Sequence, residues 1–352
     1  MTASGPISLS LAENVRFLQD TFGTSTDFYS KPLNIGGIDC RIVLFTGLSS
    51  PEKLTVMMLS ILSQEREAFA DGPALARHLL RESLIPTESA PITTREEMIE
   101  RLANGLTLLL IEGCPVALTV SSQEMPQRSV SEPDGEGNMY GPQEAFTEQL
   151  RTNISLLRRQ FRTGTLVVER HDAHNHARTE YCLCYDRARA PADTVDTLRR
   201  KLDAAHLPVL LDSSYFASFL KQDKLNLFPA AAYTGRPATA CARLCEGKVV
   251  ILVAGSPCAM VIPSFFAEHF ECLDDYSSGA VFAGLIRLLK YLAFTVAVFG
   301  PGFYVMAMTF TPEIIPIKLL ASLAEAESRT PLPPMLEMLT VTLLLEIVRE
   351  AG

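Results

Sequence analysis

YLAFTVAVFGPGFYVMAMTF occupies Tyr291–Phe310, and no charged side chain appears from residue 291 to Pro312. As a helix rising about 1.5 Å per residue, such a stretch is long enough to cross the ~30 Å hydrocarbon core of a bilayer. The sequence before residue 280 mixes charged and apolar residues as globular proteins do. We therefore predict a large water-soluble region followed by a membrane domain.

The composition of the 352-residue chain agrees with this division, because a hydrophobic content of 47% is high for a purely water-soluble protein and the excess lies in the last quarter. A net charge of −9 without a Lys/Arg-rich run excludes nucleic acid as a partner. The N-terminus lacks the basic and apolar regions of a secretory signal, so we expect the soluble region to be cytoplasmic. Arg287 and Lys290 precede the apolar stretch and favour the same orientation.

The eight cysteines are scattered and mostly lie in apolar runs, as buried thiols do in a reducing compartment. Cys182 and Cys184 alternate on one strand, and His171, His174 and His176 lie shortly before them. This spacing matches no zinc finger or ribbon. We predict neither a metal site nor a cofactor.

The soluble region contains an internal repeat. Gly105–Val120 aligns without gaps to Gly247–Ile262 at an offset of 142 residues, and each reads as a strand, a tight turn and a returning strand. Cys40–Phe45 and Tyr181–Tyr185 repeat at nearly the same offset. Two features in one register indicate duplication. The predicted fold class is therefore an α/β region of two duplicated subdomains followed by an all-α transmembrane region.

The predicted domains are a first α/β subdomain with a connecting helix at 1–160, a second α/β subdomain at 161–278, and the start of a helical membrane domain at 279–352. An apolar stripe from Phe146 to Phe161 predicts the connecting helix. Thr94 and Glu97 predict a capping box on an earlier helix.

The segment QRSVSEPDGEGNMYGPQEAFTEQLRTNISLLRR, residues 127–159, is an acidic Gly/Pro-rich loop running into that helix. Met139 and Ala145 stand where a calcium loop needs glycine and glutamate. By its physical properties alone the loop is typical of a solvated connector.

This segment also resembles the hallmark of the GerA family of spore germination proteins, roughly R-x-V-x-E-P-x-x-E, then R-G-P-x-E-G-F-x-E, then T-N-x-x-L-x-R-R. Tyr140 and Ala145 depart from the pattern. The resemblance implies a signalling or assembly motif formed by Arg128, Glu132, Pro133, Glu136, Gly141, Pro142, Phe146, Glu148, Asn153, Arg158 and Arg159.

The resemblance continues through LNLFPAAAYTGRPATACARLCEGKVVILVAGSP (225–257) to the end of the chain, although Gly235, Ala238 and Ala254 replace acidic residues of the family. It implies the A subunit of a nutrient germinant receptor in the inner spore membrane. Such a subunit is expected to form a homo-oligomer that conducts ions, in contact with membrane lipid, a transporter-like B subunit and a lipoprotein C subunit. Family members continue for further spans, so we expect this chain to be truncated. A sporulation-stage paralogue in the same family is an alternative.

In the membrane domain, Gly300-Pro301-Gly302 predicts a kink or break in the first span. Ile314–Ala321 contains Pro316 and is too short to cross, so it is predicted to be re-entrant or interfacial. In Pro331–Ala351, Glu346 is predicted either to line a conduction path or to pair with a neighbouring helix. The kink and pore candidates are Gly300, Pro301, Gly302, Pro316, Glu337, Glu346 and Arg349.

The sequence contains no phosphate loop, dinucleotide fingerprint, nucleophile elbow or HExxH motif, so we predict a protein that is not an enzyme and has no catalytic residues. We expect a subunit that couples nutrient sensing to ion release. Two alternatives remain: the paired subdomains bind a small solute in a cleft, or they serve only as an assembly scaffold.

Overall fold

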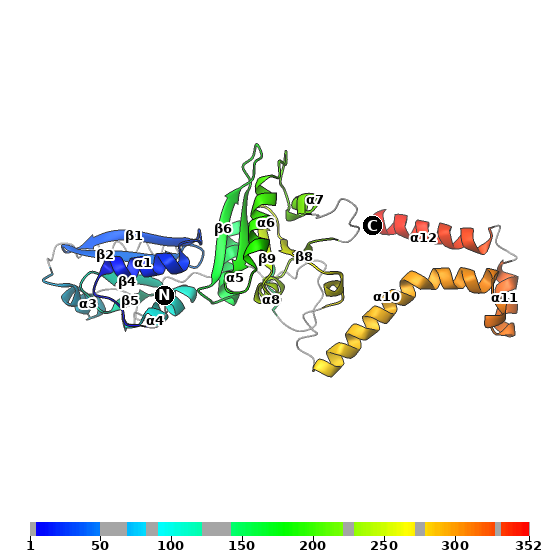
Figure 1. The fold of residues 1–352 in the computed structure, drawn as a ribbon, viewed down its shortest axis with the longest axis horizontal. Coiled ribbons are helices and arrows are strands. Elements are labelled where there is room, and N and C mark those ends of the chain that lie inside the picture. Colours follow the sequence, from blue (N-terminus) through cyan, green and yellow to red (C-terminus); the bar gives the residue numbers. More distant parts are fainter. Residues whose placement is uncertain are drawn as a thin grey trace. The chain divides into compact units, whose positions relative to one another are not determined.

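The computed structural model describes residues 5–49, 69–81, 91–121, 142–220, 229–271, 279–327 and 332–351. It divides into two compact units, Met1–Glu268 and His269–Gly352. The first unit contains two antiparallel sheets with helices, and the second is helical (Figure 1). This architecture confirms the predicted fold class.

The first subdomain is a five-stranded sheet in the order β1-β2-β4-β5-β3. Helices α1 and α4 cover one face of the sheet, and α3 packs on the other. Its elements are α1 (Leu11–Phe22), β1 (Phe28–Ile35), β2 (Ile38–Phe45), α3 (Gly72–Arg81), β3 (Pro91–Ile92), α4 (Arg95–Ala103), β4 (Thr107–Ile111) and β5 (Ala117–Val120).

The second subdomain has the same order, β6-β7-β9-β10-β8. Its elements are α5 (Leu150–Gln160), β6 (Leu166–Asp172), β7 (Glu180–Asp186), α6 (Ala192–Asp203), η1 (Ser213–Phe216), α7 (Ala217–Leu220), β8 (Ala232–Thr234), α8 (Pro237–Cys245), β9 (Val249–Val253), β10 (Ala259–Ile262) and η2 (Phe266–Phe270). The β4–β5 and β9–β10 hairpins lie 142 residues apart, as do the starts of α4 and α8. The predicted duplication is thus confirmed.

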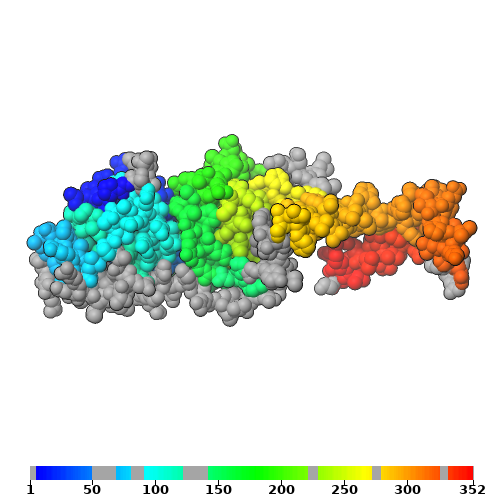
Figure 2. Space-filling model, turned by 90° about the horizontal axis from the view of Figure 1, so that it is seen from below, coloured from blue at the N-terminus to red at the C-terminus, as the bar shows by residue number. Residues whose placement is uncertain are grey.

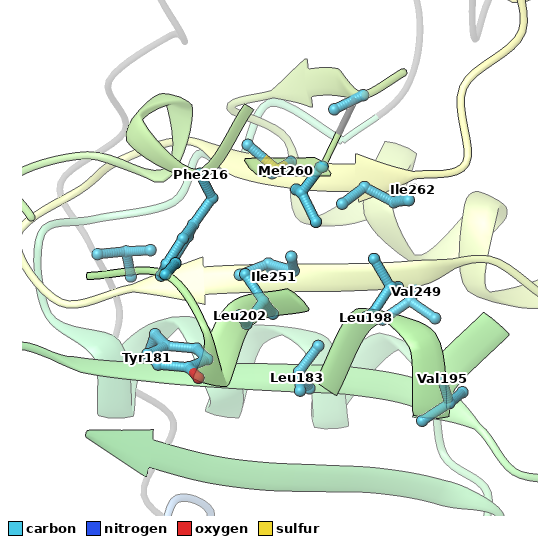
Figure 3. Packing of buried hydrophobic residues seen from close by; sticks show 14 of the residues in the cluster. Tyr181, Leu183, Val195, Leu198, Leu202, Phe216, Val249, Ile251, Met260 and Ile262 are labelled. Carbon is cyan, nitrogen blue, oxygen red and sulfur yellow. The ribbon is translucent and has the colours of Figure 1, made fainter. Parts of the chain in front are cut away.

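Strand alternation places a core on each face of the second sheet. Tyr181, Leu183 and Ile251 pack under α6, where Leu198 and Leu202 meet them (Figure 3). Cys182, Cys184, Val250 and Leu252 point to the opposite face, into a core shared with α5 and α8. The connecting helix α5 therefore buries its apolar stripe in the second core. The predicted boundary at residue 160 stays a prediction.

Local signals predicted from the sequence explain the helices of the first subdomain. Val15, Leu18 and Phe22 of α1 are buried in its core. The Thr94 hydroxyl accepts a hydrogen bond from the Glu97 N–H, and the Glu97 carboxylate accepts one from the Thr94 N–H, which confirms the predicted capping box.

The helical unit consists of α10 (Ala280–Thr309), η3 (Pro312–Ile314), α11 (Ile317–Glu327) and α12 (Pro334–Ala351). Within the described residues, α10 is the one helix long and apolar enough to cross a membrane. It continues as a helix through Pro301, and its ribbon bends along its length (Figure 1). At 11 residues, α11 is too short to span a bilayer.

Gly37 and Gly247 offer a matched test of backbone strain. Both have left-handed φ values, +87° and +85°, but a Cβ at Gly37 would meet nothing within 4 Å, whereas one at Gly247 would lie 2.7 Å from the Arg189 carbonyl oxygen. We expect Gly37→Ala to cost about 1–2 kcal/mol from conformation alone. Gly247→Ala should cost more, because the Arg189 backbone must also move. Urea unfolding of both variants measures the difference, and equal losses would contradict the predicted close approach.

Candidate functional site at the junction of the subdomains

The structure describes only part of the motif predicted in residues 127–159. Arg128, Glu132, Pro133, Glu136 and Gly141 lie outside the described residues. The structure places the remaining members, Pro142, Phe146, Glu148, Asn153, Arg158 and Arg159, along the segment that enters α5 and along α5 itself.

The first part of this segment is fastened to the second subdomain through its backbone. The Pro142 carbonyl oxygen accepts a hydrogen bond from Arg236 (3.1 Å), and the Phe146 N–H donates to Gly235 O (2.8 Å). The Glu148 carbonyl oxygen accepts from the Gly255 N–H (2.8 Å). The Phe146 ring is buried in the core beneath α5. These contacts fix where α5 begins.

Asn153 also holds the backbone at the start of α5 in place. Its buried side chain accepts a hydrogen bond from the Thr147 N–H at Oδ1 (2.8 Å) and donates from Nδ2 to Thr147 O (2.6 Å). The amide thereby satisfies two backbone groups that a helix entry would otherwise leave unpaired.

The first subdomain makes the same contacts with other residues. Asn14 bonds both backbone groups of Ser8 (3.0 and 2.7 Å), the Ile7 N–H donates to Thr93 O (2.9 Å), and the Gly113 N–H donates to Leu9 O (2.9 Å). Phe146, Glu148 and Asn153 therefore perform a structural task that both repeats require.

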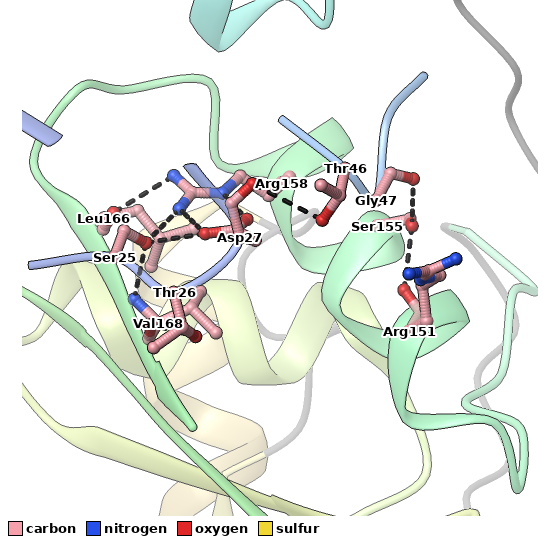
Figure 4. A network of polar contacts seen from close by, with 10 residues as sticks. All are labelled: Ser25, Thr26, Asp27, Thr46, Gly47, Arg151, Ser155, Arg158, Leu166 and Val168. Atoms are coloured by element: carbon pink, nitrogen blue, oxygen red, sulfur yellow. Dashed lines mark hydrogen bonds and ion pairs between the residues drawn. The ribbon is translucent and has the colours of Figure 1, made fainter. Parts of the chain in front are cut away.

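Arg158 differs, because its counterpart in α1, 139 residues earlier, is the exposed Gln19. The Arg158 side chain is 1% exposed and forms an ion pair with Asp27, which is 4% exposed, at 2.8 Å from Nε to Oδ2. Nη2 donates to Asp27 Oδ1 (2.8 Å) and to Ser25 Oγ (2.6 Å), and Nη1 donates to Leu166 O (3.0 Å) (Figure 4). The guanidinium carbon lies 4.1 Å from the centre of the Phe45 ring. The charge is thus paired, hydrogen-bonded and stacked.

Further hydrogen bonds surround this ion pair and close the junction. The Thr26 N–H donates to Val168 O (2.8 Å), and the Val168 N–H donates to Ser25 Oγ (3.0 Å), so the loop before β1 lies along the edge of β6. Ser155 Oγ donates to Gly47 O. Figures 1 and 2 both show the first subdomain directly against the second. Arg158 therefore joins two subdomains of one compact unit.

Arg159 makes a different kind of contact. It pairs with Glu144 of the same segment, and the Glu144 side chain is 44% exposed. Exposed ion pairs of this kind contribute at most about 1 kcal/mol. The two adjacent arginines thus have separate roles, one at the junction and one at the surface.

A second polar cluster attaches α6 to its sheet. Glu169 on β6 accepts hydrogen bonds from Tyr185 (2.6 Å) and from two nitrogens of Arg199 (2.9 and 2.8 Å), and His171 Nε2 lies 3.6 Å away. Burial alone would raise the pKa of Glu169, but the neighbouring His171, Arg199 and Tyr185 lower that pKa to about 2. The carboxylate is therefore ionised at neutral pH.

The residues considered for zinc do not converge. Cys182 and Cys184 are buried in the core with α5, and burial raises the pKa of Cys182 to about 12, which disfavours the metal-binding thiolate. His171 stacks on Tyr181, whose ring belongs to the core under α6. The described residues hold no group of three metal-binding side chains.

The membrane-domain candidates lie on separate elements. Gly300, Pro301 and Gly302 are within α10, Pro316 directly precedes α11, and Glu337 lies in the first turn of α12. Glu346 forms an ion pair with Arg349 of the same helix. Their roles in a kink or a conduction path stay predictions.

Comparison with known proteins gives the family. Residues 16–352 match the family described as Bacillus/Clostridium GerA spore germination protein. The chain belongs to the GerA family. It is 29% identical over 98% of its length to spore germination protein KA of Bacillus subtilis (strain 168), and 28% identical over 97% to spore germination protein GerLA of Bacillus cereus. It spans 64% and 70% of the lengths of those two proteins.

A solved structure confirms the fold of the two-sheet region. The N-terminal domain of the A subunit of the Bacillus megaterium spore germinant receptor GerK3 matches 75% of this chain and 98% of its own length, with a TM-score of 0.58 and 21% identity. The two relatives are named as spore germination proteins, and the solved neighbour as the A subunit of a spore germinant receptor. Family membership and α10 together indicate membrane association.

The adjacent arginines allow a controlled test of the junction. Removing one partner of a buried ion pair leaves an unpaired buried charge and costs about 3–5 kcal/mol. We therefore expect Arg158→Ala to lower the free energy of unfolding by that amount, and Arg159→Ala to change it by less than about 1 kcal/mol. Urea unfolding of the two variants checks this. If both variants lost a similar free energy of unfolding, the buried Arg158 would contribute no more to stability than the more exposed Arg159.

Glu169 predicts a pH dependence. Its pKa falls from an ordinary value of 4.5 to about 2 on folding, so its contribution to stability is complete above pH 4.5 and is lost as the pH falls toward 2. The stability gap between wild type and Glu169→Gln should therefore narrow over that range. Unfolding midpoints measured at several pH values test this, and a constant gap would argue against the lowered pKa.

Proposed function

We propose that this chain is a subunit of a membrane germinant receptor that couples nutrient sensing to ion release during spore germination, as part of an oligomeric nutrient-gated ion channel. The observation that carries the proposal is the extent of the family match, which includes both the two-sheet region and α10. One chain thus combines a domain with the fold of a germinant receptor's N-terminal domain and a candidate membrane span.

In this proposal the soluble domain serves assembly and coupling. Its two subdomains share the buried Arg158–Asp27 pair and the hydrogen bonds of Ser25 and Thr26 to Val168, all of which must break before the subdomains can separate. The domain therefore responds to a neighbouring subunit as one body. The expected neighbours are further copies of this chain, a transporter-like B subunit and a lipoprotein C subunit in the inner spore membrane, with the soluble domain in the cytoplasm.

The membrane unit would supply the conduction path. Ionisable side chains at membrane depth usually face a bundle interior or a water path. Glu346 and Arg349 lie on α12, which contacts α10. We propose that this polar face of α12 borders the path.

Potassium release from dormant spores after nutrient addition tests the function. Spores of the wild type, of a strain lacking this gene and of a strain restored with the full-length reading frame are compared across nutrient classes. We expect release to be lost for one class without the gene and restored with it. Unchanged potassium release in the deletion strain would contradict the proposed receptor role.

The same assay tests whether the contacts at the junction affect potassium release when the amount of protein is unchanged. At equal protein abundance, Arg158→Lys should impair release, because an ammonium cannot reproduce the bidentate guanidinium contact with Asp27. Arg159→Lys is the matched control and should release potassium normally. Normal release from both variants would contradict the proposed coupling role of Arg158.

A further inference from the structure

Two loops of the second subdomain meet beside the core under α6. One is the turn between β6 and β7, residues 173–179, and the other directly follows α6. Ala173 and Ala205 are both buried in that core. His174 and His206 directly follow these alanines, and both histidines are exposed. Two histidines that lie 32 residues apart in the sequence (206 − 174) thus extend from one core.

The two imidazole rings lie side by side. The centres of the His174 and His206 rings are 5.8 Å apart, and the ring planes are tilted by 50°. Neither ring forms a hydrogen bond or an ion pair with another residue in the described part of the chain. His171, by contrast, lies against Glu169 and stacks on Tyr181. The ring nitrogens of His174 and His206 are therefore available to a ligand from solvent.

Hydrogen bonds hold the backbone on both sides of His174. The Ala173 N–H donates to Thr179 O (2.9 Å). The Asn175 side chain accepts a hydrogen bond from the Thr179 N–H at Oδ1 (3.1 Å) and donates from Nδ2 to Thr179 Oγ1 (3.1 Å). Asparagine commonly closes turns in this way, by bonding backbone groups a few residues away. These contacts fix the position of His174 relative to the second sheet.

The backbone around His206 is held by the end of α6 and by the core. The Ala205 N–H donates to Leu202 O (3.1 Å) just after the helix ends, and Leu202 is buried under α6. Leu207, the residue after His206, packs against the same core. Both histidines thus extend from anchored backbone, so the fold itself sets their separation. Little conformational freedom is lost when two side chains placed in this way bind one ligand.

The separation of the two rings suits a single metal ion. Zinc binds an imidazole nitrogen at about 2.0–2.1 Å and favours tetrahedral angles, so the centres of two imidazole rings on one ion lie about 5–6 Å apart. The 5.8 Å between the ring centres of His174 and His206 falls within this range. One ion can therefore contact both rings without a movement of either backbone.

The ligand type selects the kind of ion. Imidazole suits zinc, copper and nickel, whereas magnesium and calcium prefer oxygen ligands. Because the described residues hold no group of three metal-binding side chains, His174 and His206 would be the two protein ligands, and water would complete the coordination. A site with two protein ligands keeps open positions for water or for a group from another molecule.

We propose that His174 and His206 together bind one divalent transition metal ion of the zinc, nickel and copper group. The ion crosslinks the β6–β7 turn to the end of α6. Because only the folded chain brings the two rings together, the ion stabilises the second subdomain. Sequence spacing does not reveal this pair, since His206 lies 30 residues beyond His176 (206 − 176). The site does not depend on the receptor role.

Titration of the purified full chain in detergent with zinc tests this site. Calorimetry gives the number of bound zinc ions and their dissociation constant for the wild type, His174→Ala, His206→Ala and the double variant. His176→Ala is the matched control, because His176 is an exposed histidine of the same turn. Magnesium in place of zinc is the control ion. Unfolding midpoints without metal check that the variants fold, and glutamine substitutions replace any variant that does not.

We expect each single variant to bind one zinc ion at least about tenfold more weakly than the wild type, since one of two protein ligands is gone. The double variant should lose no more than either single variant, because both side chains hold the same ion. Zinc should raise the unfolding midpoint of the wild type and of His176→Ala only. Unchanged zinc binding in both single variants would overturn the proposal. A double variant that loses two ions would identify two independent sites and would overturn it as well.

Discussion

The two-sheet region depends on the buried ion pair between Arg158 and Asp27. Moving an arginine and a carboxylate out of water is costly, and their attraction offsets that cost only when geometry and hydrogen bonding are nearly complete. Here the Arg158 guanidinium donates two hydrogen bonds to the Asp27 carboxylate and one each to Ser25 Oγ and Leu166 O. The Phe45 ring covers one face of the guanidinium. These contacts come from both subdomains, so the pair is satisfied only when the subdomains are in register.

The repeat clarifies what the family motif contains. Asn153 has a structural equivalent in Asn14, and Phe146 has one in Ile7, because each copy of the fold must start its first helix in the same way. Arg158 has no such equivalent, since Gln19 stands at its place. A motif that reads as continuous in sequence therefore combines two tasks: positioning a helix within one subdomain and joining that subdomain to its neighbour.

Features set by neighbouring residues could be predicted from the sequence. The apolar stripe of α1, the capping box at Thr94 and the hairpins 142 residues apart all follow from short-range patterns. Asp27 could not be predicted in this way. It lies 131 residues from Arg158, and nothing in its local sequence distinguishes it from an exposed aspartate before a strand. The hallmark residues from Arg128 to Gly141 lie outside the described part of the chain.

Helix α10 is longer than a membrane span requires. Thirty residues rise about 45 Å, so roughly 10 of them exceed the ~30 Å hydrocarbon core. Arg287 pairs with Glu271 at 3.2 Å, and the Lys290 ammonium donates to Phe270 O at 3.1 Å. The Phe270 ring lies 4.4 Å from that of Tyr291. Residues 270–271 are thus attached to the turn of α10 that carries Arg287 and Lys290, directly before the uncharged stretch, so these residues and that turn are held together.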